Sequence, residues 1–373
     1  MIDRHLLKNF DWSLLAVALG LSLMGVMTIY SATRPVPGAE QSSFYHKQLF
    51  WLLLGMACLF LVIRTDYRWF SKFAYIFFAV GAIFLIIVLF AGRAGMGAQR
   101  WLSLGPVSFQ PSEFFKLFFV LAVSRYLSGT EHVARLGFRE LFKIVLIFVI
   151  FPMVLILKQP DLGTAMMLLF IFFSMIIITG IKKKLLITAV IISIVSSPFV
   201  GNIVWTGLKD YQKQRLISFI HPESDPQGTT YHINQSKITI GSGGVLGKGY
   251  LKGTQGPLRF LPERHTDFIF SVFAEEWGFT GSVLLFLLYL FIILRGFDTA
   301  KKARDIEGRY LALGVALMLS FYFIINVGMT LGIVPVVGVP LPFMSYGGTA
   351  LLSNFLAVGI LINVRMRRFL LFY

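Results

Sequence analysis

Three polar side chains share one face at the start of a very apolar segment. Asp267, Ser271 and Glu275 are spaced four residues apart, so in a helix they lie one above the other. At 1.5 Å per residue, Glu275 would lie about 12 Å further along the helix than Asp267. A carboxylate among apolar residues is difficult to explain by packing, and proton transfer is a common use of one. Asp267 is therefore the first candidate for a catalytic base, while Glu275 and Glu276 either serve a site or pair internally.

A second polar group opens another apolar segment, in the sequence Gln110-Pro111-Ser112-Glu113-Phe114-Phe115-Lys116. Glu113 and Lys116 are three residues apart, so they share a helical face and can pair. Two interpretations follow. The pair is either a structural contact between packed helices or the wall of a polar cavity, to which Arg100 would add a cationic fork for an anion.

Two further polar positions lie at the edges of apolar segments. Asp161 directly precedes such a segment, where it either caps a helix or supplies a carboxylate at the rim of a site. Arg264 and His265 stand shortly before Asp267. His265 could ligate a metal, but a single histidine beside an arginine is more often an ordinary hydrogen-bonding residue.

The composition identifies the elements that must position these side chains. The chain has 373 residues, of which 56% are hydrophobic and only 14% charged, with a mean hydropathy of +0.76. Its apolar runs are continuous rather than alternating, which favours membrane-spanning helices over a soluble fold or a β-barrel. We predict an all-α, polytopic transmembrane helix bundle of about ten spans, at residues 12–31, 48–63, 73–92, 112–128, 143–157, 163–180, 185–204, 268–294, 310–332 and 347–364.

The first of these segments is expected to stay in the mature protein. It is long and has no small-residue cleavage site at a suitable distance, so it reads as a span rather than a signal peptide. The single cysteine, Cys58, excludes a disulfide within the chain.

The basic residues indicate the orientation. With both termini in the cytoplasm, the inside segments carry 20 Lys and Arg and the short outside segments carry 5. Cytoplasmic loops are typically enriched in these residues, so we predict a multi-pass membrane protein with both termini in the cytoplasm. The net charge of +16 is then a matter of topology, and nucleic acid is not an expected partner.

One loop differs from the others. We treat residues 1–373 as a single membrane domain in which residues 205–267 form a large extracytoplasmic loop between spans seven and eight. Its middle, Gly241 to Gly256, is rich in glycine but lacks the residues of a phosphate-binding P-loop. It is either a flexible linker or a mobile cover over a site.

The segment from Val334 to Gly348 contains three prolines and three glycines. Irregular backbone at membrane depth is tolerated only where protein buries it or where it lines a cavity. Asn326, inside the preceding span, is a further polar group that needs a partner. With this segment included, the candidate substrate-binding residues are Glu113, Lys116, Asp161, Arg100, Arg264, Ser271, Glu275 and Ser345.

These motifs together resemble one family. Gln110-Pro111-Ser112-Glu113, Gln159 to Thr164, Pro262 to Phe270 and Pro340 to Gly348 are similar to motifs of the SEDS proteins (shape, elongation, division and sporulation). The division type usually carries a lysine where this chain reads Val336-Val337-Gly338, so the resemblance favours the elongation type. The resemblance places the family's essential aspartate on Asp267.

The resemblance implies a peptidoglycan glycosyltransferase of the bacterial inner membrane that acts on lipid II, a disaccharide-pentapeptide on undecaprenyl pyrophosphate. It also implies a class B penicillin-binding protein as partner, together with other proteins of the elongation complex. Asp267 would deprotonate the acceptor hydroxyl. Lys116, Arg100 or Arg264 would stabilise the leaving pyrophosphate. A divalent cation, Mg or Mn, held by Asp267 could do the same, and no organic cofactor is expected.

Two other classes share some of these features. A lipid II flippase would also carry intramembrane charges and broken helices, although the chain shows no obvious inverted repeat. A scaffold that anchors wall enzymes would not need a carboxylate at position 267.

Overall fold

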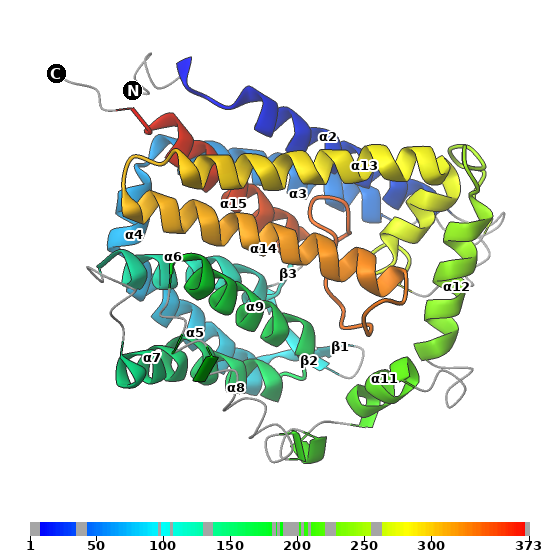
Figure 1. Ribbon diagram of the computed structural model, residues 1–373. Helices are drawn as coiled ribbons and strands as arrows, with labels where there is room; N and C mark the ends of the chain where they lie inside the picture. Colours follow the sequence, from blue (N-terminus) through cyan, green and yellow to red (C-terminus); the bar gives the residue numbers. More distant parts are fainter. Residues whose placement is uncertain are drawn as a thin grey trace.

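Long apolar helices make up most of the chain in the computed structural model (Figure 1). The structure describes residues 8–34, 43–95, 98–104, 107–129, 137–180, 210–220, 229–254 and 263–369, with a few more between 184 and 207. Its helices are α2 (Trp12–Ala32), α3 (Phe44–Arg64), α4 (Tyr67–Lys72), α5 (Ala74–Ala91), α6 (Pro111–Gly129), α7 (Phe138–Ile144), the π-helical turn η2 (Val145–Ile150), α8 (Phe151–Lys158), α9 (Leu162–Ile178), α11 (Asp210–Ile220), α12 (Thr229–Ser242), α13 (Ile269–Lys301), α14 (Ile306–Thr330) and α15 (Gly348–Met366).

A small antiparallel sheet joins α5 to α6. It consists of β1 (Arg93–Gly95), β2 (Ala98–Leu104) and β3 (Val107–Phe109), in the order β1-β2-β3. Pairing sets Arg93 opposite Trp101 and Leu102 opposite Phe109. Because Arg100 lies on β2, the sheet fixes the position of one candidate site residue.

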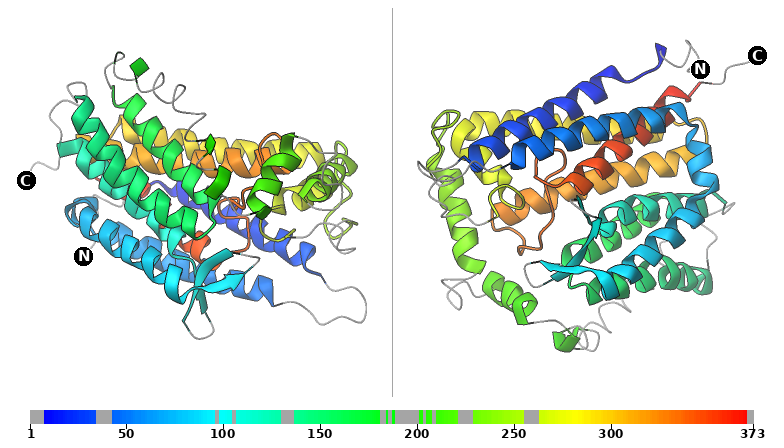
Figure 2. Two further views of the ribbon diagram at one scale, coloured as in Figure 1. Left: turned by 90° about the horizontal axis from the view of Figure 1, so that it is seen from below. Right: turned by 180° about the vertical axis from the view of Figure 1, so that it is seen from behind.

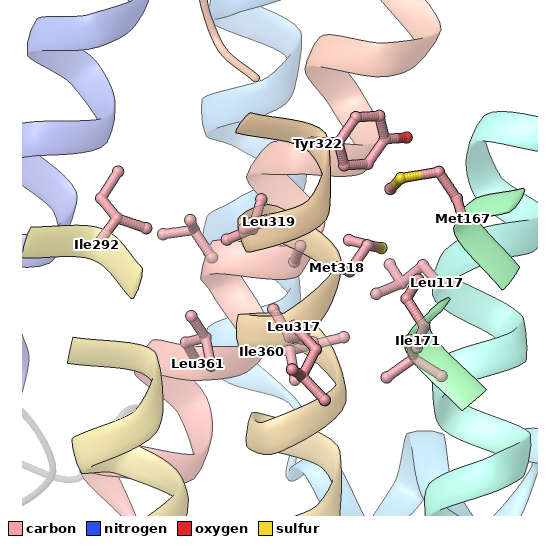
Figure 3. Packing of buried hydrophobic residues seen from close by; sticks show 14 of the residues in the cluster. Leu117, Met167, Ile171, Ile292, Leu317, Met318, Leu319, Tyr322, Ile360 and Leu361 are labelled. Carbon is pink, nitrogen blue, oxygen red and sulfur yellow. The ribbon is translucent and has the colours of Figure 1, made fainter. Parts of the chain in front are cut away.

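The bundle has α14 and α15 at its centre. About 78% of the apolar window of α14 and 89% of that of α15 are buried, against 28–44% for the other membrane-capable helices. Leu317, Met318 and Leu319 of α14 lie between Ile171 of α9 and Ile292 of α13 in this core (Figure 3). Helices on the outside leave large apolar side chains exposed, which suits contact with lipid.

The two ends of the bundle carry different elements. The start of α2 and the end of α15 lie at the same end, while α12 and α11 lie across the other end (Figures 1 and 2). The first end is tied together by ion pairs: Asp11 contacts Arg295 at 2.7 Å and Arg365 at 3.0 Å. The start of α13, which carries the polar motif around Asp267, belongs to the opposite end.

Among the residues that the structure describes, seven helices are long and apolar enough to cross a membrane, and α9 is a shorter apolar helix. Nine of the ten predicted spans fall on helices of the structure, including the run from α7 to α8. The helix α6 matches the span 112–128 but also carries Glu113, Lys116 and Arg125. The segment 185–204 lies mostly outside the described residues, so the number ten stays a prediction.

The interpretation of residues 205–267 as a flexible linker is wrong for its described parts, and a role as a mobile cover over a site stays a prediction. They include the helices α11 and α12. The glycine-rich stretch that follows is bound to α13: Lys248 N–H donates to Glu275 O at 3.0 Å and Gly249 N–H to Glu276 O at 2.9 Å. A Cβ atom on Gly247 would lie 2.2 Å from Glu276 O. These glycines therefore serve close approach between backbones rather than freedom of movement.

An elbow interrupts α13 at Gly278, whose φ of 66° and ψ of −164° are accessible almost only to glycine. Phe279 N–H donates to Gly244 O at 2.9 Å and Thr280 N–H to Val245 O at 3.1 Å. The glycine-rich stretch thus supplies acceptors for two N–H groups just beyond the elbow, and the short first limb of α13 can take its own direction.

Candidate active site

Asp267 lies in a turn directly before α13. The turn is closed by Phe268 N–H donating to Glu263 O at 3.3 Å, and Glu263 has a positive φ of 51°. Asp267 is half-buried. A Cβ atom placed on Gly338 would lie 3.5 Å from Asp267 Oδ2, so the carboxylate faces the irregular segment between α14 and α15. A Cβ atom at position 338 would be in ordinary van der Waals contact with it, but the φ of 72° at Gly338 disfavours any residue other than glycine.

That segment, residues 331–347, folds back over the end of the bundle and is orange in Figure 1. Ser345 joins it to the Asp267 turn: its hydroxyl donates to Thr266 O at 2.6 Å and accepts from Leu341 N–H at 2.8 Å. Tyr346 N–H donates to His265 O at 2.8 Å. Ser345 therefore acts through the backbone of both segments, within one residue of the candidate base.

Gln48 of α3 secures the same segment from the other side. It is fully buried; its amide donates to Ser345 O at 3.1 Å and accepts from Gly347 N–H at 3.3 Å. The sequence analysis did not single it out. The sequence feature that could have identified it is a glutamine at the start of an apolar run, where a buried polar group needs a hydrogen-bond partner.

Arg264 and His265 lie within the same turn. Arg264 donates to Ala32 O at the end of α2 at 2.6 Å. His265 stacks on Phe44, with ring centroids 4.7 Å apart. Burial lowers the pKa of His265 below its ordinary value, with Glu263 opposing and Arg264 reinforcing that shift. The stacking on Phe44 fits an ordinary packing role for this histidine.

Glu113 and Lys116 do form the predicted ion pair, at 2.7 Å, with both side chains almost wholly buried. Tyr322 of α14 donates to the second oxygen of Glu113 at 2.7 Å, and the Lys116 ammonium lies 4.4 Å from the Tyr322 ring centroid. Ser353 of α15 donates to Glu113 O at 2.9 Å. These contacts favour the interpretation as a packing contact, because α6, α14 and α15 meet there.

Arg100 and Asp161 come together at the start of α9. The Asp161 carboxylate accepts from Thr164 N–H at 3.1 Å, which confirms the predicted helix cap. Arg100 lies 3.8 Å from it and donates to the carbonyl of Pro160. A Cβ on Gly163 would lie 2.6 Å from Val337 O, so this corner also packs against the segment that faces Asp267.

The predicted acidic face of α13 is wrong in one respect, because Asp267 precedes the helix rather than opening it. Ser271 is hydrogen-bonded to Ser236 of α12 at 2.7 Å. Glu275, with no exposed surface, accepts from Lys248 at 2.6 Å and from Thr254 N–H at 2.9 Å. Both side chains thus attach the large loop to α13.

Glu276 has the same role as its neighbour. It is buried, accepts from Leu251 N–H at 3.2 Å and is hydrogen-bonded to Ser31 at the end of α2. Of the two interpretations for this acidic pair, the structure favours internal pairing with the loop.

Asp267 is the candidate carboxylate ligand for a divalent cation at this site. In the parts of the chain that the structure describes, no three His, Cys, Asp or Glu side chains come together as a metal-binding group. Magnesium sites often use one or two carboxylates and complete their coordination with substrate phosphates and water. Asp267 therefore fits a cation shared with a pyrophosphate, and does not fit a cage made by protein alone.

A separate cavity of about 970 Å³ opens at the end that carries α4 and the start of α14. Two ion pairs lie in its wall, Arg68–Asp305 at 2.7 Å and Arg125–Glu307 at 2.9 Å. Burial raises the pKa of Asp305, but hydrogen bonds from a backbone N–H of α14, a tyrosine and Arg68 outweigh it and leave the pKa below its ordinary value. None of the predicted site residues lines this cavity.

The chain is similar to proteins of known activity over nearly its whole length. Residues 11–369 match a model of the FtsW/RodA/SpoVE family, described as cell cycle proteins. Peptidoglycan glycosyltransferase MrdB of Escherichia coli K12 is 38% identical over 361 residues, covering 96% of this chain and 94% of that protein. Peptidoglycan glycosyltransferase RodA of Treponema pallidum is 33% identical, covering 97% of this chain and 98% of the relative.

Two solved structures share the fold. One, described as structural coordination of polymerization and crosslinking by a peptidoglycan synthase complex, has a TM-score of 0.81 and 30% identity over 96% of this chain and 98% of that one. The rod shape determining protein RodA of Thermus thermophilus has a TM-score of 0.70 and 28% identity over 97% and 98%.

Proposed function

The chain belongs to the FtsW/RodA/SpoVE family and is a multi-pass membrane peptidoglycan glycosyltransferase, and we propose that Asp267 is its catalytic base. The substrate we propose is lipid II, polymerised into β-1,4-linked glycan on the outer face of the inner membrane during elongation. The observation that carries the assignment is the placement of Asp267: half-buried at the end of the bundle away from the start of α2, and facing Gly338.

The reaction follows from the chemistry of the substrate. The 4-hydroxyl of the GlcNAc of one lipid II loses its proton to the Asp267 carboxylate as its oxygen attacks the anomeric carbon of the growing strand. The bond from that carbon to the pyrophosphate breaks, and the lipid pyrophosphate leaves with the electron pair. One displacement inverts the α-linked donor into a β link, so no covalent nucleophile is required.

The leaving pyrophosphate needs positive charge. Lys116 is buried and paired with Glu113, and Arg100 is bound to the turn before α9. Arg264 is also bound, through Nε to Ala32 O at 2.6 Å, but it is half-buried and only three residues from Asp267. It is the cation that we propose for this role because of this proximity. A divalent cation, Mg or Mn, when bound by Asp267 and the pyrophosphate, would neutralise charge on the leaving group.

We also propose that the chain works with a class B penicillin-binding protein and other elongation proteins, with both termini in the cytoplasm. One structure with the same fold is described as a peptidoglycan synthase complex that coordinates polymerization and crosslinking, which supports a cross-linking partner. A conformational equilibrium biased by such a partner would make the isolated chain less active.

The deciding experiment is glycan polymerisation from purified lipid II by this chain with its class B partner, comparing wild type, Asp267→Asn and Glu263→Gln. Glu263 lies in the same turn and accepts from Thr266 at 3.0 Å, so it is a matched control for loss of a carboxylate. We expect polymer from wild type and Glu263→Gln and none from a folded Asp267→Asn. A wild-type amount of polymer from Asp267→Asn would refute the role of Asp267 as the base. Flipping of lipid II without any polymer would contradict the polymerase assignment.

A further inference from the structure

Asn326 is a fully buried amide near the C-terminal end of the apolar helix α14. A buried polar group is retained only where it makes specific hydrogen bonds, because an apolar side chain of similar size packs at least as well. Its contacts therefore indicate why an asparagine stands here.

The amide nitrogen of Asn326 donates to two backbone carbonyls that lie far apart in sequence. One is Asp267 O, at 3.1 Å, and the other is Val339 O, at 2.8 Å. Neither belongs to α14. The side chain is thus a bridge between the turn before α13 and the segment between α14 and α15.

The two carbonyls belong to the residues that frame the reaction site. Asp267 carries the proposed base, and Val339 directly follows Gly338, which faces the Asp267 carboxylate. Ser345 joins the same two segments further along, through Thr266 O. Asn326 therefore fixes the width of the gap between the carboxylate and the opposing backbone.

The orientation of the amide supports this role. Both contacts are carbonyl acceptors, so only the NH₂ group can face them. The amide oxygen, Oδ1, is buried and has no hydrogen-bond partner within the described residues. An unsatisfied acceptor lowers stability, so stability alone does not explain the residue, whereas a double donor aimed at two segments does.

We propose that Asn326 is a positioning residue that holds the Asp267 carboxylate at its working distance from the segment 336–345. This inference rests on the proposed role of Asp267. A displacement of about 1 Å at a reacting group can lower a rate about 100-fold. Loss of the bridge therefore slows the chemical step without removing groups that bind substrate.

The test compares Asn326→Leu and Asn326→Asp with Thr330→Val in the polymerisation assay. Thr330 lies one turn further along α14, is fully buried, and its hydroxyl donates only to Val327 O within the helix. Thr330→Val is thus a control for removal of a buried polar group. Asn326→Asp keeps the size of the side chain but has at most one O–H donor, so it cannot bond both carbonyls at once. It serves if the leucine variant does not fold.

We expect both Asn326 variants to lose about 10- to 100-fold in kcat with KM for lipid II within about threefold of wild type. Thr330→Val should keep wild-type kcat, and the midpoint of thermal unfolding of Asn326→Leu should not fall below that of Thr330→Val. Wild-type kcat in a folded Asn326 variant would overturn the inference, as would a loss of activity that matches the loss of folded protein. Full activity of Asp267→Asn would instead refute the proposed base itself.

Discussion

The buried pair Glu113–Lys116 allows a sharp test of how the bundle is held together. We consider Lys116→Met, which keeps the length of the side chain and removes the charge. The Glu113 carboxylate would then be left with Tyr322 as its remaining side-chain donor, at 2.7 Å. Both charged groups are almost wholly buried, so solvent cannot replace the lost partner.

The size of the effect follows from this burial. Removing one partner of a buried ion pair typically destabilises a protein by about 3–5 kcal/mol. The lysine also lies 4.4 Å from the Tyr322 ring centroid, which adds about 0.5–2 kcal/mol for a desolvated cation. Replacing both partners, in Glu113→Gln/Lys116→Met, removes the uncompensated charge, so the double variant should be within about 1–2 kcal/mol of wild type.

The assay is thermal unfolding in detergent followed by tryptophan fluorescence. An unfolding entropy of about 2.1 cal/mol/K per residue gives about 1.3 °C per kcal/mol for a chain of 373 residues. Lys116→Met should therefore lower the midpoint by roughly 4–9 °C, and the double variant should recover most of that loss. Lys302→Met is the control, because Lys302 is half-exposed and pairs with Asp298 at 2.8 Å. Such a surface pair contributes at most about 1 kcal/mol.

One result would refute the reasoning. Glu113 and Lys116 do not compensate each other if Lys116→Met shifts the midpoint no more than Lys302→Met does. The same holds if the double variant is less stable than Lys116→Met. They would then be separate polar groups, and the cavity-wall interpretation of Lys116 would regain support.

Three further predictions concern the loop, the pH dependence and the cation. Gly247→Ala should release the stretch 243–254 and reduce polymerisation several-fold, since its Cβ would lie 2.2 Å from Glu276 O; limited proteolysis should show faster cleavage there. Asp305→Asn should lower the thermal midpoint at pH 7, and its difference from wild type should shrink below about pH 4. The reason is that the pKa of Asp305 is lower in the folded than in the unfolded chain, so its carboxylate stabilises the folded state only above the unfolded pKa. A difference that stays constant with pH would contradict this. Chelation of divalent cations should reduce polymerisation by the wild type, and added Mg or Mn should restore it. Full activity in the presence of chelator would contradict the proposal that a cation binds at Asp267.

The positions of the long apolar helices could be predicted from the sequence because apolar length determines them, whereas the more polar helices α11 and α12 could not. The contacts around Asp267 could not. Asn326 and Val339 are thirteen residues apart, yet the amide of one reaches the carbonyl of the other, and no periodicity encodes such a contact. Glu113 and Lys116 were predictable as a pair, because a spacing of three on a helix places them together. Tyr322, their third member, comes from a different helix.

Two expectations failed for physical reasons that composition hides. Glycine in the stretch 241–256 suggested freedom of movement, whereas Gly243 and Gly247 are small so that their backbone can approach α13. The common face of Asp267 and Glu275 assumed that the helix includes position 267. The turn from Glu263, with its positive φ, delays the helix to Ile269 and directs Asp267 elsewhere.

Tyr322 and Asn326 lie four residues apart on α14, so one turn of a single helix contacts both the buried ion pair and the backbone of the proposed base. A helix that slides along its axis by one residue moves about 1.5 Å and rotates about 100°, which would break both contacts together. Both contacts therefore depend on the same axial position of α14. Variants at these two positions should consequently combine non-additively, although neither side chain hydrogen-bonds the other.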